Sequence, residues 1–355
     1  MQAASGGNRL HQNHIPRGWC QGAAPMKVVF LQDLNPQTVR YFKEAFAGHE
    51  LVFPQTEDLA KLTAAARDAD VLVGYRLPQE VLDAAPKLKA FLTGAAGVDR
   101  TVRENLKVRP EVQVGNSHAN ALDVAEHALA LAMAAAKLVA RGDRELRKGD
   151  WTLRYDDVPG VLLTGKTVVI VGYGAIGRAL AQLLAGFKAR VVGVRSSRKT
   201  HGVDALGVQM VGAEDLDLSL KAADFVFVFA PLTPKTKGLL GAQQFAAMKP
   251  SAVLVNVSRG PVVDEDALFD ALKGGRLGAA GIDVWYVYPK GGADVKDTGP
   301  GHQPFHELQN VVMSPHRASY TERMHREQWD DVVESIHRLA RGEAVKYKVD
   351  LEAGY

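Results

Sequence analysis

Three glycines, Gly172, Gly174 and Gly177, stand between an apolar run at 167–171 and a predicted helix at 178–187, which has helical apolar spacing. The run Thr-Val-Val-Ile-Val is typical of a buried parallel strand. In a strand–turn–helix unit, the first glycine permits the tight turn, the second lets the backbone approach a pyrophosphate, and the third lets helix and strand pack closely. The helix N-terminus adds N–H groups for phosphate oxygens. The residues predicted to contact a dinucleotide are Gly172, Tyr173, Gly174, Ala175, Ile176 and Gly177.

The residues after the next predicted strand, 190–194, indicate which dinucleotide binds. A carboxylate normally stands about 20 residues beyond the glycines and binds the adenosine ribose hydroxyls of NAD. Arg195 occupies that place here, with Ser196 and Arg198 close behind it. A guanidinium cannot accept a hydroxyl proton, but it pairs well with a phosphate. The sequence therefore predicts NADP(H) in preference to NAD(H), with a solvated basic loop as the alternative interpretation.

Polar residues follow several other predicted strands in this half of the chain. Further buried strands are predicted at 225–229, 253–257 and 279–282. They are followed by Pro231-Leu232-Thr233, by Ser258-Arg259 and by Asp283, respectively. Ligands bind at the carboxyl ends of the strands in doubly wound sheets, so we expect these residues to face one site.

The preceding residues, from Met26 onward, alternate between short apolar strands and helices. Strands are predicted at 28–31, 51–53, 71–73, 90–92 and 112–114, and helices at 36–46, 59–66, 79–84 and 122–137. Such alternation predicts a parallel sheet, and the first strand lacks a glycine motif, so this part forms a separate, smaller domain. The loop 94–99 has little side chain and could form an anion-binding nest or an ordinary turn. The alanine-rich helix 122–137 permits close packing, within the chain or in a dimer.

Composition excludes several classes of protein. A chain of 355 residues suggests two domains. The net charge of +3 gives no argument for nucleic acid or a membrane surface. The single cysteine, Cys20, fits a reducing compartment, and no apolar run reaches the ~20 residues of a membrane span. We expect a cytoplasmic protein whose residues 1–25 form a disordered extension, with organelle targeting left open.

Taken together, these motifs resemble the D-isomer-specific 2-hydroxyacid dehydrogenases. The resemblance covers roughly residues 70–340. The motifs that carry it are the turn at 172–177, Pro-Leu-Thr at 231–233, the run 255–264, Gly-Ile-Asp-Val at 281–284 and the dipeptide Pro315-His316. It implies an α/β fold in which a Rossmann dinucleotide-binding domain is inserted into a smaller flavodoxin-like parallel-sheet substrate domain. The implied boundaries are 121–315 for the NADP-binding domain and 26–120 plus 316–345 for the substrate domain.

The resemblance also implies the chemistry. It implies hydride transfer between NADP(H) and a small D-2-hydroxy or 2-keto acid, such as glyoxylate or hydroxypyruvate, in a homodimer. Arg259 matches the substrate-binding electrophile and His316 the acid/base, a task that suits histidine because its usual pKa lies near neutrality. The implied substrate-binding backbone is that of Ala95, Ala96, Gly97 and Val98. The implied cofactor contacts beyond the glycine turn and the basic loop are Pro231, Thr233, Val257, Ser258 and Asp283.

One position departs from the family. A carboxylate paired with the catalytic histidine usually precedes the proline of this segment, but Tyr288 precedes Pro289 here. A carboxylate raises the pKa of a neighbouring imidazole, whereas a phenol is neutral near pH 7. We therefore expect His316 to protonate at lower pH than in a glutamate-containing relative, unless Asp294 or Asp297 replaces the missing carboxylate.

Two other functions stay open on the sequence alone. One is a regulator with weakened catalysis that still senses NADP(H), and the other is a formate-dehydrogenase-like hydride transfer. No metal site is predicted, since His302 and His306 lack a convincing ligand spacing.

Overall fold

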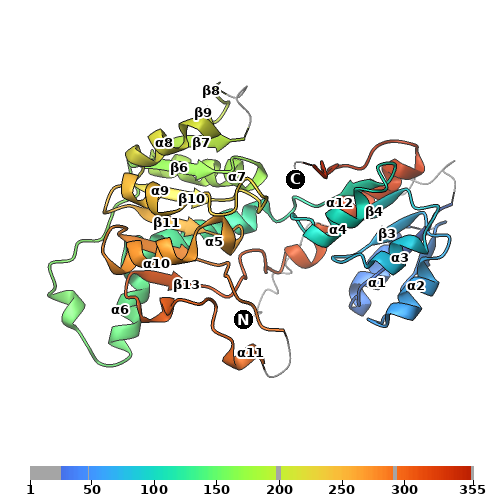
Figure 1. Cartoon of the computed structure of the whole chain (residues 1–355), viewed down its shortest axis with the longest axis horizontal. Coiled ribbons are helices and arrows are strands. Elements are labelled where there is room, and N and C mark those ends of the chain that lie inside the picture. The colour runs from blue at the N-terminus through green and yellow to red at the C-terminus, as the bar shows by residue number, and fades with distance from the viewer. Residues whose placement is uncertain (1–24, 47, 197–200, 291–293, 353–355) are drawn as a thin grey trace, which may run out of the picture. The chain divides into compact units, whose positions relative to one another are not determined.

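The structure is a computed structural model that describes residues 25–46, 48–196, 201–290 and 294–352 (Figure 1). The chain divides into two compact units, and each is described by itself. Unit 1 comprises Met1–Ser117 and Gln328–Glu352, and unit 2 comprises His118–Glu327 with Ala353–Tyr355. The extension predicted at 1–25 lies, but for its last residue, outside the described residues. Among the described helices, none is both long and apolar enough to span a bilayer.

Unit 1 is built around a parallel five-stranded sheet in the order β2-β1-β3-β4-β5. Its strands are β1 (Lys27–Phe30), β2 (Glu50–Val52), β3 (Val71–Val73), β4 (Ala90–Leu92) and β5 (Gln113–Gly115). Its helices are α1 (Pro36–Ala45), α2 (Leu59–Ala66), α3 (Gln79–Asp83), α4 (Arg100–Leu106) and α12 (Met324–Ala340) from Gln328 onward. This strand order is that of flavodoxin-like folds, so the predicted smaller α/β domain is confirmed.

The C-terminal helix α12 completes unit 1. Trp329 is buried and packs edge-on against Phe42, with ring centroids 5.4 Å apart. It also lies against Gly94, where an added Cβ would stand 3.2 Å from the indole ring. The hydroxyl of Ser117 donates to Asp331 at 2.7 Å. These contacts fix the end of β4 and the loop after β5 to the returning helix.

Unit 2 is built around an eight-stranded sheet in the order β13-β12-β11-β10-β6-β7-β9-β8, parallel except for β8. Its strands are β6 (Thr167–Val171), β7 (Arg190–Arg195), β8 (Gly202–Val203), β9 (Gln209–Gly212), β10 (Phe225–Val228), β11 (Val253–Asn256), β12 (Ala279–Ile282) and β13 (Val311–Met313). Its helices are α5 (Ala121–Ala136), α6 (Val139–Leu146), α7 (Ala175–Leu184), α8 (Leu216–Ala222), α9 (Ala242–Ala247), α10 (Glu265–Lys273) and α11 (Asp294–Asp297). From β9 through β7 and β6 to β12 the sheet has the Rossmann order, as predicted.

The central strands of unit 2 are buried along their whole length, which explains their continuous apolar sequence. Every residue of β6, β10, β11 and β12 is buried. The alanine-rich helix α5 packs closely on this sheet, because a Cβ at Gly281 would stand only 2.8 Å from the Leu131 Cβ. The small side chains of α5 therefore allow this helix to pack closely against the sheet of unit 2.

Two features of unit 2 differ from the sequence-based expectation. The helix α7 begins at Ala175, three residues before the expected start at Arg178, so its N-terminus directly adjoins the glycine turn. The strands β8, β9 and β13 were not predicted. β8 has only two residues, both exposed, and β13 is buried only at Val311, so neither carries a continuous apolar signal.

Candidate active site

The glycine turn between β6 and α7 has the geometry of a phosphate cradle. Gly172 has φ +95°, and a Cβ there would lie 2.4 Å from the Ala230 nitrogen. At Gly177 a Cβ would lie 3.0 Å from the Ile170 side chain, so the helix packs directly on the strand. Gly174 has open space around it and no side chain to cap the helix. The turn thus leaves both room and helix N–H groups for an anionic ligand.

The predicted basic segment begins at the tip of β7. Arg195 is half-buried, and its guanidinium makes no hydrogen bond or ion pair with the described residues. Ser196 follows and is exposed, whereas Arg198 lies outside the described residues. The strand tip carries no carboxylate, so the positive charge of Arg195 is available to a phosphate.

Four other predicted cofactor residues lie in the loops after β10 and β11. Thr233 donates its N–H to Thr236 Oγ1 at 2.8 Å, which fixes the turn that begins at Pro231. Val257 and Ser258 directly follow β11 and are buried. Because β10 pairs in parallel with β6, and β11 in parallel with β10, these loops lie at the same sheet edge as the glycine turn.

Arg259 stands on the loop after β11, which closely approaches the loop after β12. A Cβ at Gly260 would lie 2.4 Å from the carbonyl oxygen of Trp285, so only glycine permits this approach. Arg259 Nη1 donates to the Ser258 carbonyl at 2.6 Å. In the described part of the chain its other guanidinium N–H groups have no partner, which leaves them for a carboxylate or carbonyl oxygen.

Asp283, which is fully buried, anchors the segment that carries His316. Its carboxylate accepts hydrogen bonds from Ser314 Oγ at 2.5 Å and from the N–H groups of Arg317 and Ala318, both at 2.9 Å. Burial by itself opposes ionisation, but hydrogen bonds from His127, Ser314 and the backbone outweigh it and hold the pKa of Asp283 well below its usual range. Most of its acceptor capacity is therefore used within the protein.

His127, on α5, also belongs to this network. Its Nε2 lies 3.0 Å from Ser314 Oγ and 3.3 Å from the nearer Asp283 oxygen. No sequence signal links His127 to residues more than 150 positions away, because the contact depends on how α5 packs against β12 and β13.

His316 lies beside Tyr288, the residue that departs from the family pattern. The Tyr288 hydroxyl oxygen is 2.9 Å from His316 Nδ1 and also accepts the Trp285 N–H at 3.0 Å. The phenol can donate to a neutral imidazole, or its oxygen can accept from the Nδ1–H of an imidazolium. Desolvation and then the positive charge of Arg259 lower the pKa of His316, and the negative charge of Asp283 opposes them only in part.

The acidic residues that could have replaced the missing carboxylate do not contact His316 in the described part of the chain. Asp294 and Asp297 lie in α11 and make no hydrogen bond or ion pair with His316, so Tyr288 is the partner of that ring. No cluster of three histidine, cysteine or acidic side chains in the described ranges could hold a metal ion.

The loop after β4 in unit 1 carries the predicted anion-binding backbone. The Ala96 carbonyl accepts from Asn116 Nδ2 at 2.6 Å, and the Ala95 carbonyl accepts from the Ser117 N–H at 3.1 Å. The N–H groups of Ala96, Gly97 and Val98 have no acceptor in the described part of unit 1. Three successive free N–H groups on a fixed loop are typical of an anion-binding nest.

Comparison with known proteins identifies the family that this fold and site define. The family "D-isomer specific 2-hydroxyacid dehydrogenase, NAD binding domain" matches residues 129–318. The chain therefore belongs to the D-isomer-specific 2-hydroxyacid dehydrogenases.

Individual relatives carry different names. The chain is 36% identical over 287 residues to a glyoxylate reductase of Korarchaeum cryptofilum, covering 78% of this chain and 81% of the relative. It is 34% identical over 333 residues to the D-3-phosphoglycerate dehydrogenase of Mycobacterium tuberculosis, covering 93% of this chain but only 60% of that relative. Among solved structures, a D-isomer specific 2-hydroxyacid dehydrogenase from Xanthobacter autotrophicus in complex with NADPH and MES matches with a TM-score of 0.76 and 28% identity, covering 94% of this chain and all of that chain.

Proposed function

We propose that this chain is an NADP(H)-dependent reductase of small 2-keto acids of the glyoxylate or hydroxypyruvate type. The observation that carries the proposal is the pair Arg259 and His316 at the carboxyl edge of a Rossmann sheet. The glyoxylate reductase relative, of which the chain covers most, supports this substrate class. The phosphoglycerate dehydrogenases are much longer proteins, of which the chain spans about 60%.

The preference for NADP(H) is supported by the tip of β7. Arg195 takes the place of the ribose-binding carboxylate, and its guanidinium has no partner among the described residues. The open surroundings of Gly174 and the uncapped start of α7 suit the diphosphate. When bound, NADP(H) supplies the hydride for the carbonyl carbon.

The protein's own residues then polarise and protonate the substrate. The free N–H groups of Arg259 stabilise the negative charge that develops on the carbonyl oxygen. His316, held through Nδ1 by Tyr288, presents Nε2 and gives its proton to that oxygen. The proposal assigns the substrate carboxylate to the N–H groups of Ala96, Gly97 and Val98. These assigned roles require no metal ion.

The function is tested by following NADPH and NADH oxidation at 340 nm with glyoxylate, hydroxypyruvate and larger 2-keto acids. We expect turnover with the small acids and a higher kcat/KM with NADPH than with NADH. Tight NADPH binding without turnover on any acid would contradict the proposal and favour the regulator instead.

Tyr288 gives this site a distinctive pH dependence. Reduction requires protonated His316, so activity is present below the pKa of that residue and is lost as pH rises through it. Desolvation and Arg259 lower this pKa. We therefore expect the loss of activity at a lower pH than in relatives that carry a glutamate at this position. In Tyr288→Glu the new carboxylate favours the imidazolium, and the falling limb of the kcat/KM–pH profile should move to higher pH. Tyr288→Phe is the control without a charge, and a Tyr288→Glu profile that coincides with wild type would refute the assignment.

We also propose a homodimer formed through the segment between α6 and β6. Figure 1 shows this segment extending from the edge of unit 2. It exposes large apolar side chains, among them Trp151 (61% exposed) and Tyr155 (82% exposed). Such a concentration is unusual for a surface that stays in water, and a second copy of the chain would cover it.

Trp151→Asp should therefore convert the dimer to a monomer in sedimentation velocity. Leu218→Asp, at an equally exposed apolar position on α8, should leave the dimer intact. A wild-type monomer at micromolar concentration, or a dimer that survives Trp151→Asp, would contradict this assignment.

A further inference from the structure

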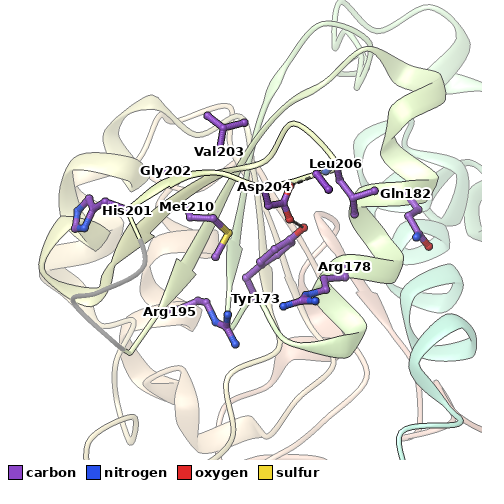
Figure 2. Close-up of a pocket in the computed structure, with 11 residues that line it drawn as sticks. Tyr173, Arg178, Gln182, Arg195, His201, Gly202, Val203, Asp204, Leu206 and Met210 are labelled. Carbon is purple, nitrogen blue, oxygen red and sulfur yellow. Dashed lines mark hydrogen bonds between the residues drawn. The ribbon is translucent and has the colours of Figure 1, made fainter.

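A pocket beside the glycine turn is lined by two arginines (Figure 2). It lies between the start of α7 and the segment that leads through β8 to β9. Arg178 comes from α7 and Arg195 from β7, and both line the pocket together with Tyr173. Neither makes a hydrogen bond or ion pair with the described residues. Two free guanidinium groups from different elements suit a phosphomonoester dianion better than one does.

The one acidic residue in the described lining of this pocket is Asp204, and its carboxylate is already occupied. Oδ2 accepts the Tyr173 hydroxyl at 2.7 Å, and Oδ1 accepts the N–H groups of Leu206 and Val208 at 2.9 and 3.0 Å. Figure 2 shows Asp204 turned toward the phenol. These neutral donors keep the carboxylate from pairing with an arginine, although the charge of Arg178 is near enough to lower the pKa of Asp204.

The Tyr173 side chain is well placed to hold this arrangement. The residue is 1% exposed, and its ring fills the space beside Gly193, where a Cβ would lie 2.7 Å from the ring. The ring is therefore fixed by packing, and its hydroxyl is the only part that reaches Asp204. Phenylalanine would keep the packing and remove the hydrogen bond.

We propose that Tyr173 is a specificity-determining positioning residue, which holds Asp204 so that Arg178 and Arg195 together bind the adenosine 2′-phosphate of NADP(H). The inference rests on the proposed NADP(H) preference and adds two elements to it. Arg178 supplies a second guanidinium from the helix side, and the tyrosine keeps the neighbouring carboxylate from competing for it.

The test measures binding of adenosine 2′,5′-bisphosphate and adenosine 5′-monophosphate by calorimetry, because these probes differ only in the 2′-phosphate and need no turnover. Wild type should prefer the bisphosphate. Arg178→Gln should reduce bisphosphate affinity by about tenfold or more, as expected for loss of a charge-assisted hydrogen bond, and leave the monophosphate unchanged. Arg341→Gln, at an exposed arginine directly after α12 that pairs with Glu343, is the matched control and should change neither affinity.

Two further variants test the tyrosine. Tyr173→Phe should weaken bisphosphate binding selectively, because the released carboxylate can pair with Arg178. Tyr173→Phe combined with Asp204→Asn should restore it, because the competing charge is gone. A melting temperature for each variant shows that the fold is retained.

The outcomes separate the two proposals. Equal binding of both probes by wild type would refute the NADP(H) preference itself. A wild-type preference that survives Arg178→Gln would leave that preference standing and overturn the present inference. Failure of the double variant to recover binding would overturn the role of Tyr173.

Discussion

Replacement of His316 by asparagine is expected to lower kcat/KM for 2-keto acid reduction by about 10²–10⁴-fold, the usual contribution of a positioned general acid. Asparagine can still hydrogen-bond the carbonyl oxygen, but it cannot give up a proton. Affinity for NADPH should be unchanged, because among the described residues no hydrogen bond or ion pair joins His316 to the glycine turn or to the tip of β7. Single-turnover absorbance at 340 nm measures the rate of NADPH oxidation directly.

The matched control is His302→Asn. That histidine is exposed and pairs with Glu265 at the start of α10, so its loss should leave reduction unaffected. If the His316 variant kept most of the wild-type rate while the control behaved as expected, His316 would not be the proton donor.

Replacement of Arg259 by glutamine is expected to reduce kcat by about 10²–10³-fold, as for other preorganised donors to a developing oxyanion. KM for the keto acid should rise as well, since the same guanidinium meets the substrate before reaction. Arg259→Lys retains the charge but not the planar fork, so we expect it to recover only part of the activity.

Added guanidinium ion provides a second measurement on the Arg259→Gln variant. Rescue of the rate in a saturable manner would show that the missing group acts on the substrate. A variant whose kcat equals that of wild type, with or without guanidinium, would exclude Arg259 from the chemistry.

The sequence was sufficient to predict the fold and the sheet edge at which the candidate site residues lie. The glycine spacing at 172–177 and the buried runs of β6, β10, β11 and β12 are local signals, because each depends on neighbours within a few residues. The Rossmann and flavodoxin-like types of the two sheets followed from strand–helix alternation and from the family resemblance. The polar residues after these strands, including Arg259, could be assigned to one edge for the same reason.

The supporting contacts could not be predicted, because they join residues that are distant in the chain. Asp283 was expected to face the cofactor, yet the structure also shows it binding the backbone after His316 and contacting His127 across more than 150 positions. The Tyr173–Asp204 hydrogen bond depends on where β8 and β9 place a short turn. No periodicity marks such pairs.

The backbone conformation at position 316 disfavours the histidine side chain that the proposed chemistry requires. With φ +57°, His316 occupies a left-handed conformation that disfavours most side chains by roughly 1–2 kcal/mol. Asn and Gly adopt this conformation more readily. Directed evolution for heat resistance alone would therefore tend to replace this histidine, the proposed proton donor, and a stability screen of this chain should be paired with an activity screen.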